Sequence, residues 1–263
     1  FNTENGEVNE GLIRFDIVFY VRMKDGLSQI IINVEAQKDE PNGYEILKKH
    51  GVTRLCHFTK FQKLCHILES EQGILASSVI SNDIKNVTDA ERYDGETNYV
   101  CCSIQYPNSW YLSKARDKNF DLIFKEWVIL YIQPSVLNHR NAKFCPCNAS
   151  KEFGAYINND MSQLESIFAP KQPTYKYLRS SMMPACCPTD GQAEILIKNN
   201  IPRNLIFGIV VPNKEMAERT AAMLKITNQT QIKISICKEI FTKTWSDMVR
   251  NGQLPKEYEY LYD

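Results

Sequence analysis

A polar turn leads directly into an apolar strand in the segment Thr189-Asp190-Gly191-Gln192-Ala193-Glu194-Ile195-Leu196-Ile197. Side chains alternate along a strand, so Gln192 and Glu194 should point to the same side. A carboxylate and an amide held side by side at a strand entrance can orient and polarise a sugar. Enzymes that break a glycosidic bond need such a carboxylate, because it stabilises the sugar cation of the transition state. The alternative interpretation is a solvent-facing Gln-x-Glu on an edge strand.

Further sequence blocks precede this segment in a fixed order. They are His57-Phe58-Thr59, Gln72-Gly73-Ile74-Leu75, Asp89-Ala90-Glu91-Arg92-Tyr93-Asp94-Gly95 and Ser103-Ile104-Gln105-Tyr106-Pro107-Asn108. Together with Gln192-Ala193-Glu194, the ordered set resembles the DarT family of NAD-dependent ADP-ribosyltransferases over roughly residues 50–240. Members of that family are bacterial toxins that modify thymidine bases in single-stranded DNA. The resemblance implies an α+β ADP-ribosyltransferase fold, with split antiparallel sheets around an NAD cleft.

Length and composition fit one large domain with an appendage. The chain has 263 residues, 43% of them apolar, and no net charge. No apolar run approaches the roughly 18 residues that a membrane-spanning helix needs. Nine cysteines without regular spacing favour a reducing cytoplasm over a disulfide framework. We therefore expect a cytoplasmic monomer that has no contact with a membrane.

The N-terminal segment resembles a different enzyme class. Residues 12–22 and 29–37 alternate apolar and polar side chains around Lys24-Asp25-Gly26, which predicts a β-hairpin. It resembles the central, metal-binding hairpin of transposase-associated PD-(D/E)XK nucleases, whose acidic and amide positions match Asp16, Glu35 and Gln37. Only that hairpin of the nuclease fold is present, and about 45 residues rarely bury a core. We predict that residues 1–49 are a truncated, non-catalytic segment and that residues 50–263 form the transferase domain; a metal-dependent nuclease stays an alternative.

Short helices and strands mix without βαβ alternation, which indicates an α+β fold. Helical spacing predicts helices at residues 60–70, 120–124, 161–168 and 213–225. Apolar runs bounded by turn residues predict strands at residues 100–104, 126–132, 204–211 and 231–237.

The resemblance supplies a set of cofactor-binding residues, because no Gly-x-Gly-x-x-Gly sequence is present to bind a dinucleotide. His57, Phe58 and Thr59 match the family segment that ends a central strand and binds NAD+. Leu75 lies in the loop that borders the cofactor. His66 stands where some members have a small residue facing it. An isolated His-x-Thr would more simply be structural.

The same resemblance implies two catalytic residues. Glu194 matches the catalytic glutamate, which is expected to bind the nicotinamide-ribose 2′-hydroxyl and to stabilise the cation as nicotinamide leaves. Arg92 matches an arginine of the NAD-binding loop that is implicated in the reaction with the base. A guanidinium suits a pyrophosphate or an acceptor base, but it is a poor proton acceptor without an unusual environment.

The acceptor is expected to lie near the catalytic turn. Residues 170–250 carry a net charge of +6, and Tyr175 beside Lys176 could stack on bases and bind phosphates. Gln192 occupies a position that contacts the acceptor in related transferases, and Asp190 and Thr189 adjoin it in the turn. We predict that these five residues bind the substrate, although a solvated basic face would explain the charges equally well.

Several questions of function stay open at this stage. Thymidine in single-stranded DNA is the family default, and an RNA base is the alternative within the same chemistry. A non-catalytic nucleic-acid-binding module is a third possibility. The implied partner is a macrodomain ADP-ribosyl glycohydrolase that acts as antitoxin. Cys145-Pro146-Cys147 and Cys186-Cys187 have poor spacing for zinc, so NAD+ is expected as substrate and no metal is expected.

Overall fold

The computed structural model describes residues 42–80, 93–117, 125–172 and 174–262, and the backbone of residues 21–23 and 26–28. The chain divides into two compact units, residues 1–41 and 42–263. The predicted boundary lay later, after residue 49. The two boundaries differ in where they place helix α1 (Gly43–Lys49). In the structure it belongs to the second unit, because Ile46 and Leu47 are buried in the core of that unit.

In the first unit, strands β1 (Val21–Met23) and β2 (Gly26–Ser28) pair antiparallel, with Met23 opposite Gly26. This pairing lies on either side of Lys24 and Asp25, where the sequence predicts the turn, and only these six residues of the segment are described. Asp16, Glu35 and Gln37 lie outside the described residues. The resemblance of this segment to a nuclease stays a prediction.

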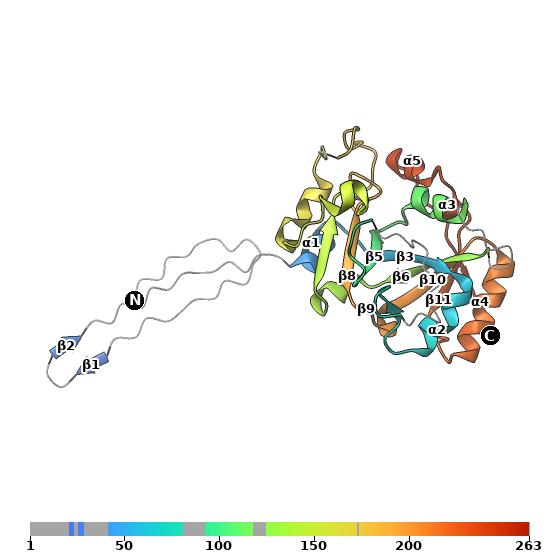
Figure 1. The fold of residues 1–263 in the computed structure, drawn as a ribbon, viewed down its shortest axis with the longest axis horizontal. Coiled ribbons are helices and arrows are strands. Elements are labelled where there is room, and N and C mark those ends of the chain that lie inside the picture. Colours follow the sequence, from blue (N-terminus) through green and yellow to red (C-terminus); the bar gives the residue numbers. More distant parts are fainter. Residues whose placement is uncertain are drawn as a thin grey trace. The chain divides into compact units, whose positions relative to one another are not determined.

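The second unit is built on an eight-stranded sheet, in the order β12-β11-β10-β6-β3-β5-β8-β7 (Figure 1). Its strands are β3 (Leu55–Lys60), β5 (Tyr99–Ile104), β6 (Trp127–Ile132), β7 (Ala142–Cys145), β8 (Glu194–Lys198), β10 (Ile206–Val211), β11 (Lys233–Ile236) and β12 (Tyr258–Tyr260). All neighbours pair antiparallel except β10 and β11. A small second sheet joins β4 (Ile74–Leu75) to β9 (Asn200–Ile201).

Strand β6 shows why the sheet is buried on both faces. Every residue from Trp127 to Ile132 is at most 3% exposed. Val128, Leu130 and Ile132 belong to one hydrophobic cluster, whereas Trp127, Ile129 and Tyr131 belong to another. A strand that contributes to two cores needs apolar side chains at successive positions, which explains the uninterrupted run that predicted it.

Helices cover each of these two faces (Figure 1). The first core takes side chains from α1, from α2 (Leu64–Glu69), from α4 (Lys214–Ile226) and from the 3₁₀ helix η4 (Met161–Phe168). The second core takes side chains from α3 (Ser109–Asp117), η6 (Glu239–Phe241) and α5 (Trp245–Arg250). The other short helices are η1 (Phe61–Lys63), η2 (Pro134–Asn138), η3 (Lys151–Gly154) and η5 (Arg203–Leu205). Within the described ranges, no helix is both long and apolar enough to cross a membrane.

Most predicted elements are present where they can be compared. The helix expected at residues 60–70 is formed by η1 followed by α2, with Ile67 buried and Cys65 only partly so. The helix at 161–168 is a 3₁₀ helix that begins at Asp160, whose carboxylate accepts a hydrogen bond from the Ser162 amide. The helix predicted at 120–124 lies outside the described residues.

The eight-stranded sheet splits between strands β3 and β5. Strand β3 pairs with β6 along its whole length, residues 55–60, but with β5 only at Leu55 and Cys56. From His57 onward β3 therefore parts from β5, and two arms form. One arm is β12-β11-β10-β6-β3 and the other is β5-β8-β7. The predicted split antiparallel arrangement is confirmed, as two arms of one sheet that stay joined at one end.

Candidate active site

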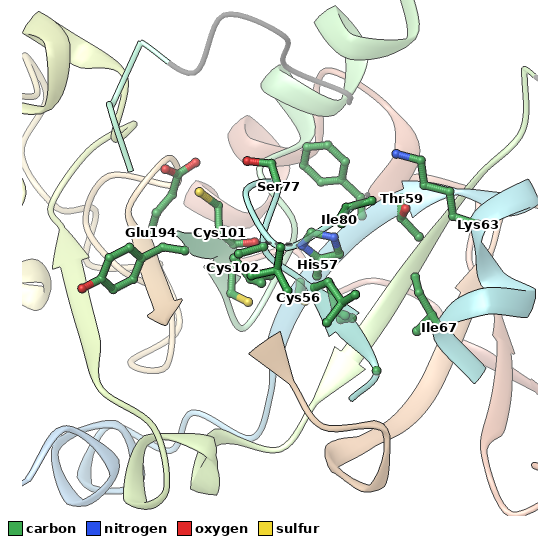
Figure 2. A pocket seen from close by; sticks show the side chains of 18 of the residues that line it. Cys56, His57, Thr59, Lys63, Ile67, Ser77, Ile80, Cys101, Cys102 and Glu194 are labelled. Carbon is green, nitrogen blue, oxygen red and sulfur yellow. Dashed lines mark hydrogen bonds between the residues drawn. The ribbon is translucent and has the colours of Figure 1, made fainter. Parts of the chain in front are cut away.

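A cavity of about 700 Å³ lies where the two arms part (Figure 2). It contains Glu194 and five residues that the sequence assigned to cofactor binding: His57, Phe58, Thr59, His66 and Leu75. The structure thus brings together residues that are up to 137 positions apart in the chain. The predicted grouping of these six residues is therefore observed, while their individual roles stay predictions.

His57 occupies the point at which β3 leaves β5. Its Nδ1 lies 2.9 Å from the carbonyl oxygen of Cys101 on β5. A carbonyl oxygen can only accept, so Nδ1 carries the proton of this hydrogen bond. The ring therefore bridges the two arms where backbone pairing has stopped, and it faces the cavity (Figure 2).

Glu194 opens strand β8 and is only 8% exposed. Its Oε1 accepts a hydrogen bond from Asn148 Nδ2 at 3.3 Å, and its Oε2 accepts one from the Ala149 amide at 3.0 Å. Ala193 and Ile195 belong to the main core, whereas Glu194 between them lines the cavity. Two donors on a buried carboxylate stabilise its ionised form and fix its direction.

The turn before Glu194 is held internally. Thr189 and Asp190 are only 1% and 3% exposed. The Thr189 hydroxyl donates to the carbonyl oxygen of Ala169 at 2.7 Å, and the Asp190 carboxylate accepts from the Gln192 amide at 2.9 Å. Burial raises the pKa of the Asp190 carboxyl, which hydrogen bonding to Gln192 partly offsets. These contacts form the turn, and none of the three side chains is among those that line the cavity; their binding to a substrate stays a prediction.

Tyr175 and Lys176 belong to an aromatic and basic cluster at the surface. The rings of Tyr175 and Tyr177 are 5.5 Å apart, edge to face. The Arg250 guanidinium lies 4.7 Å from the Tyr177 ring centroid, and the Lys176 ammonium lies 4.6 Å from it. The sequence did not predict Arg250 as a member, because it is distant in the chain and lies on α5.

The end of the cavity away from Glu194 carries a lysine (Figure 2). Burial, with the ammonium of Lys60 nearby, lowers the pKa of Lys63 to about 8. No role for Lys63 was predicted from the sequence. Its position allows an electrostatic contact with an anionic group of a ligand whose opposite end reaches Glu194.

Arg92 lies outside the described residues, so its predicted roles in catalysis and cofactor binding stay predictions. Asp94, two residues later, lines the cavity. Asn148 and Ser150 line it as well. Nothing in the linear sequence indicated that Asn148 contacts Glu194.

Of the two cysteine pairs in the sequence, Cys145, Cys147 and Cys187 are buried and Cys186 is half-buried. Cys145 and Cys147 are buried with their Sγ atoms 3.7 Å apart. In the part of the chain that the structure describes, no three His, Cys, Asp or Glu side chains are grouped so that they could hold a metal ion.

Comparison with known families identifies the fold. The family described as ssDNA thymidine ADP-ribosyltransferase, DarT, matches residues 56–242. The chain belongs to the DarT family. The matched range contains the cavity segments from His57 to Glu194, and it begins with strand β3.

Solved DarT structures share this architecture. Thermus sp. 2.9 DarT in complex with ADP-ribosylated ssDNA is similar with a TM-score of 0.55 and 17% identity, over 73% of this chain and 97% of that chain. The same protein in complex with NAD+ gives a TM-score of 0.52 and 16% identity, over 72% of this chain and 97% of that chain. At such identities the likeness establishes the DarT fold. No curated protein shows a significant match to the sequence.

Proposed function

We propose that this DarT-family chain transfers ADP-ribose from NAD+ to thymidine in single-stranded DNA and releases nicotinamide. The observation that carries the proposal is the position of the Glu194 carboxylate. Two hydrogen bonds hold it at one end of a cavity that His57, Phe58 and Thr59 also line. Family membership supplies the reaction class. In the reaction, the bond between the anomeric carbon and nicotinamide breaks. A bond from that carbon to a thymine ring nitrogen forms, and the thymine proton passes to a base.

Glu194 stabilises the sugar cation and accepts a hydrogen bond from the ribose 2′-hydroxyl. A carboxylate has about four acceptor sites, so the bonds from Asn148 and Ala149 orient it without using its whole capacity. Charge that develops on the ribose is stabilised most strongly by a pre-oriented carboxylate in a site with little water. Arg92 acts on the acceptor base or on the pyrophosphate.

NAD+ lies along β3, with its nicotinamide ribose at Glu194 and its adenosine toward α2. His57 and Thr59 offer hydrogen bonds to the nucleotide, and Phe58 and Leu75 supply apolar contact. His66 lines the same cavity from α2. Lys63 lines the same end of the cavity, where its ammonium can donate hydrogen bonds to the adenosine.

The DNA strand runs past the Glu194 end of the cavity. Tyr175 stacks on bases and Lys176 binds phosphates, and Gln192, with Asp190 and Thr189 behind it, shapes the turn that faces the acceptor. Stacking tolerates any base, and it therefore supplies affinity more than choice of base. An RNA strand would use the same contacts. In the cell the activity would act as a toxin, paired with a macrodomain hydrolase that removes the modification.

Mass spectrometry of short oligonucleotides tests the reaction. Wild-type protein, Glu194→Ala and the control Glu218→Ala, which changes an exposed glutamate on α4, are incubated with NAD+ and single-stranded DNA or RNA. We expect one ADP-ribose on thymine-containing DNA with the wild type and the control, and none with Glu194→Ala. Addition to RNA alone would show that the acceptor is RNA and that the transfer reaction is the same. Intact NAD+ with unmodified strands would refute the transferase, and metal-dependent cleavage of the strands would favour the nuclease.

A further inference from the structure

Phe153 combines two features that are each costly for an aromatic residue. Its side chain is 80% exposed, and its backbone is left-handed with φ 55°. Glu152 before it is also left-handed, with φ 47°. Such conformations strain every residue other than glycine, and they are retained where surrounding structure enforces them, often at functional sites. An exposed ring that buries little surface does not compensate for that strain by packing.

The strained turn packs against the segment that borders the cavity. Gly154 has φ +87°, and a Cβ atom there would lie 2.9 Å from the Asp94 carbonyl oxygen, so only glycine fits. Next to this contact, the rings of Phe153 and Tyr93 are 6.1 Å apart at an interplanar angle of 76°. Tyr93 is itself 48% exposed. The two rings therefore form one exposed aromatic pair carried by two different loops.

This aromatic pair adjoins the catalytic end of the cavity. On one loop, Asn148 and Ser150 line the cavity, and Asn148 contacts Glu194. On the other loop, Asp94 lines it directly after Tyr93. An acceptor base has to approach the anomeric carbon at this end, because the carboxylate that stabilises the sugar cation is here.

We propose that Phe153, together with Tyr93, is a stacking surface for an unpaired nucleobase of the DNA strand at the mouth of the cavity. The inference rests on the proposed function, and it adds a binding contact that neither the motif nor the family match assigns. Every nucleobase has an aromatic face, so two exposed rings at right angles can contact the face and the edge of one base. The backbone strain is then the cost of presenting the ring to the strand.

The test measures DNA affinity and thermal stability on the full chain. The probe is a fluorescently labelled, thymidine-containing single-stranded DNA, with NAD+ omitted so that no reaction occurs. We expect Phe153→Gly and Phe153→Ala to weaken binding about 5- to 100-fold, the range that one stacked base contributes, and Phe153→Trp to keep it. Tyr258→Ala, which removes an exposed ring from β12, is the control and should bind like the wild type.

Thermal stability distinguishes recognition from a structural role. Because glycine adopts the left-handed region without steric cost, Phe153→Gly should unfold at a temperature no lower than the wild type while it loses DNA affinity. A lower unfolding temperature with unchanged affinity would show that the ring is structural and would overturn the proposal. So would affinity within twofold of the wild type. Modification of the oligonucleotide is measured in parallel. If the wild type modifies the DNA and Phe153→Gly binds and modifies it equally well, only this inference is refuted. If the wild type binds the DNA but does not modify it, only the proposed reaction is refuted.

Discussion

The carboxylate of Glu194, which we propose to be catalytic, is held by a side chain that the linear sequence does not connect with it. Asn148 contacts Glu194 through its amide nitrogen, and its amide oxygen accepts from the Ser150 backbone amide at 3.2 Å and from the Ser150 hydroxyl. An amide has one acceptor end and one donor end. By occupying the acceptor end, Ser150 turns the donor end toward Glu194.

At this residue scale we predict that Asn148→Ala lowers kcat about 10- to 100-fold and leaves the KM for NAD+ nearly unchanged, because one of two oriented donors on the carboxylate is lost. Steady-state kinetics with varied NAD+ measures both parameters.

The matched control is Asn158→Ala, which removes an exposed amide that donates to Gln163 at 3.0 Å in the same region of the chain. It should keep wild-type kcat. Ser150→Ala should reproduce part of the Asn148→Ala loss, and Ser150→Thr, which keeps the hydroxyl, should restore it. An Asn148→Ala protein with wild-type kcat would show that the Ala149 amide alone positions Glu194.

The cavity residues that the sequence identified are those within recognisable blocks, such as His57 and Glu194. The contact between Asn148 and Glu194 spans 46 positions and exists because Cys145 pairs with Glu194 across β7 and β8. Strand register is set by the whole sheet, so no local pattern contains it. The contact of Arg250 with Tyr177 joins helix α5 to a distant loop, so no local pattern contains it either.

At the scale of elements, the short β4–β9 pair determines where the wall of the cavity lies. Leu75 lines the cavity and pairs with Asn200. The chain enters β4 through Gly73, where φ is +65° and a Cβ atom would lie 2.3 Å from the Ile201 carbonyl oxygen. Because that neighbour is backbone, it cannot move without displacing β9.

We therefore predict that Gly73→Ala lowers the free energy of unfolding by about 2–4 kcal/mol and raises the KM for NAD+, since β4 has to shift. Denaturant titration and steady-state kinetics measure the two effects. Gly51→Ala is the control, because Gly51 has φ +72° but nothing within 4 Å of a Cβ atom. It should cost only about 1–2 kcal/mol, the backbone term alone, and leave the KM unchanged. Equal losses in both variants would contradict the steric argument.

The sequence predicted elements best where one or two apolar faces left a clear period. The run at β6 and the stripe of α4, capped by Asn213 at the Met216 amide, are of this kind. The pairing order was not predictable, because β6 lies between β3 and β10, strands from distant parts of the chain. The nature of η4 was missed for a different reason: eight residues give too few turns to distinguish a 3₁₀ helix from an α-helix.

At the scale of the whole molecule, the described cavity is lined entirely by residues of the second unit. That unit also starts with its own helix signal, because the Asn42 side chain accepts a hydrogen bond from the Glu45 amide at 3.0 Å and caps α1. The sequence placed the boundary after residue 49 because the resemblance to DarT begins near residue 50. Packing places α1 with the transferase unit, since Leu47 is fully buried there.

Two truncations separate these boundaries. We predict that a chain lacking residues 1–41 unfolds cooperatively at the wild-type midpoint and retains transfer, because it keeps the whole second core and the cap of α1. A chain lacking residues 1–49 should lose at least about 4 kcal/mol, since the buried side chains of Ile46 and Leu47 leave a cavity. Thermal unfolding and the oligonucleotide assay measure both. If removing residues 1–41 abolished folding or transfer, the first unit would be part of the working enzyme. If the full chain cleaved DNA with a metal ion and this truncation abolished the cleavage, the first unit would be a nuclease.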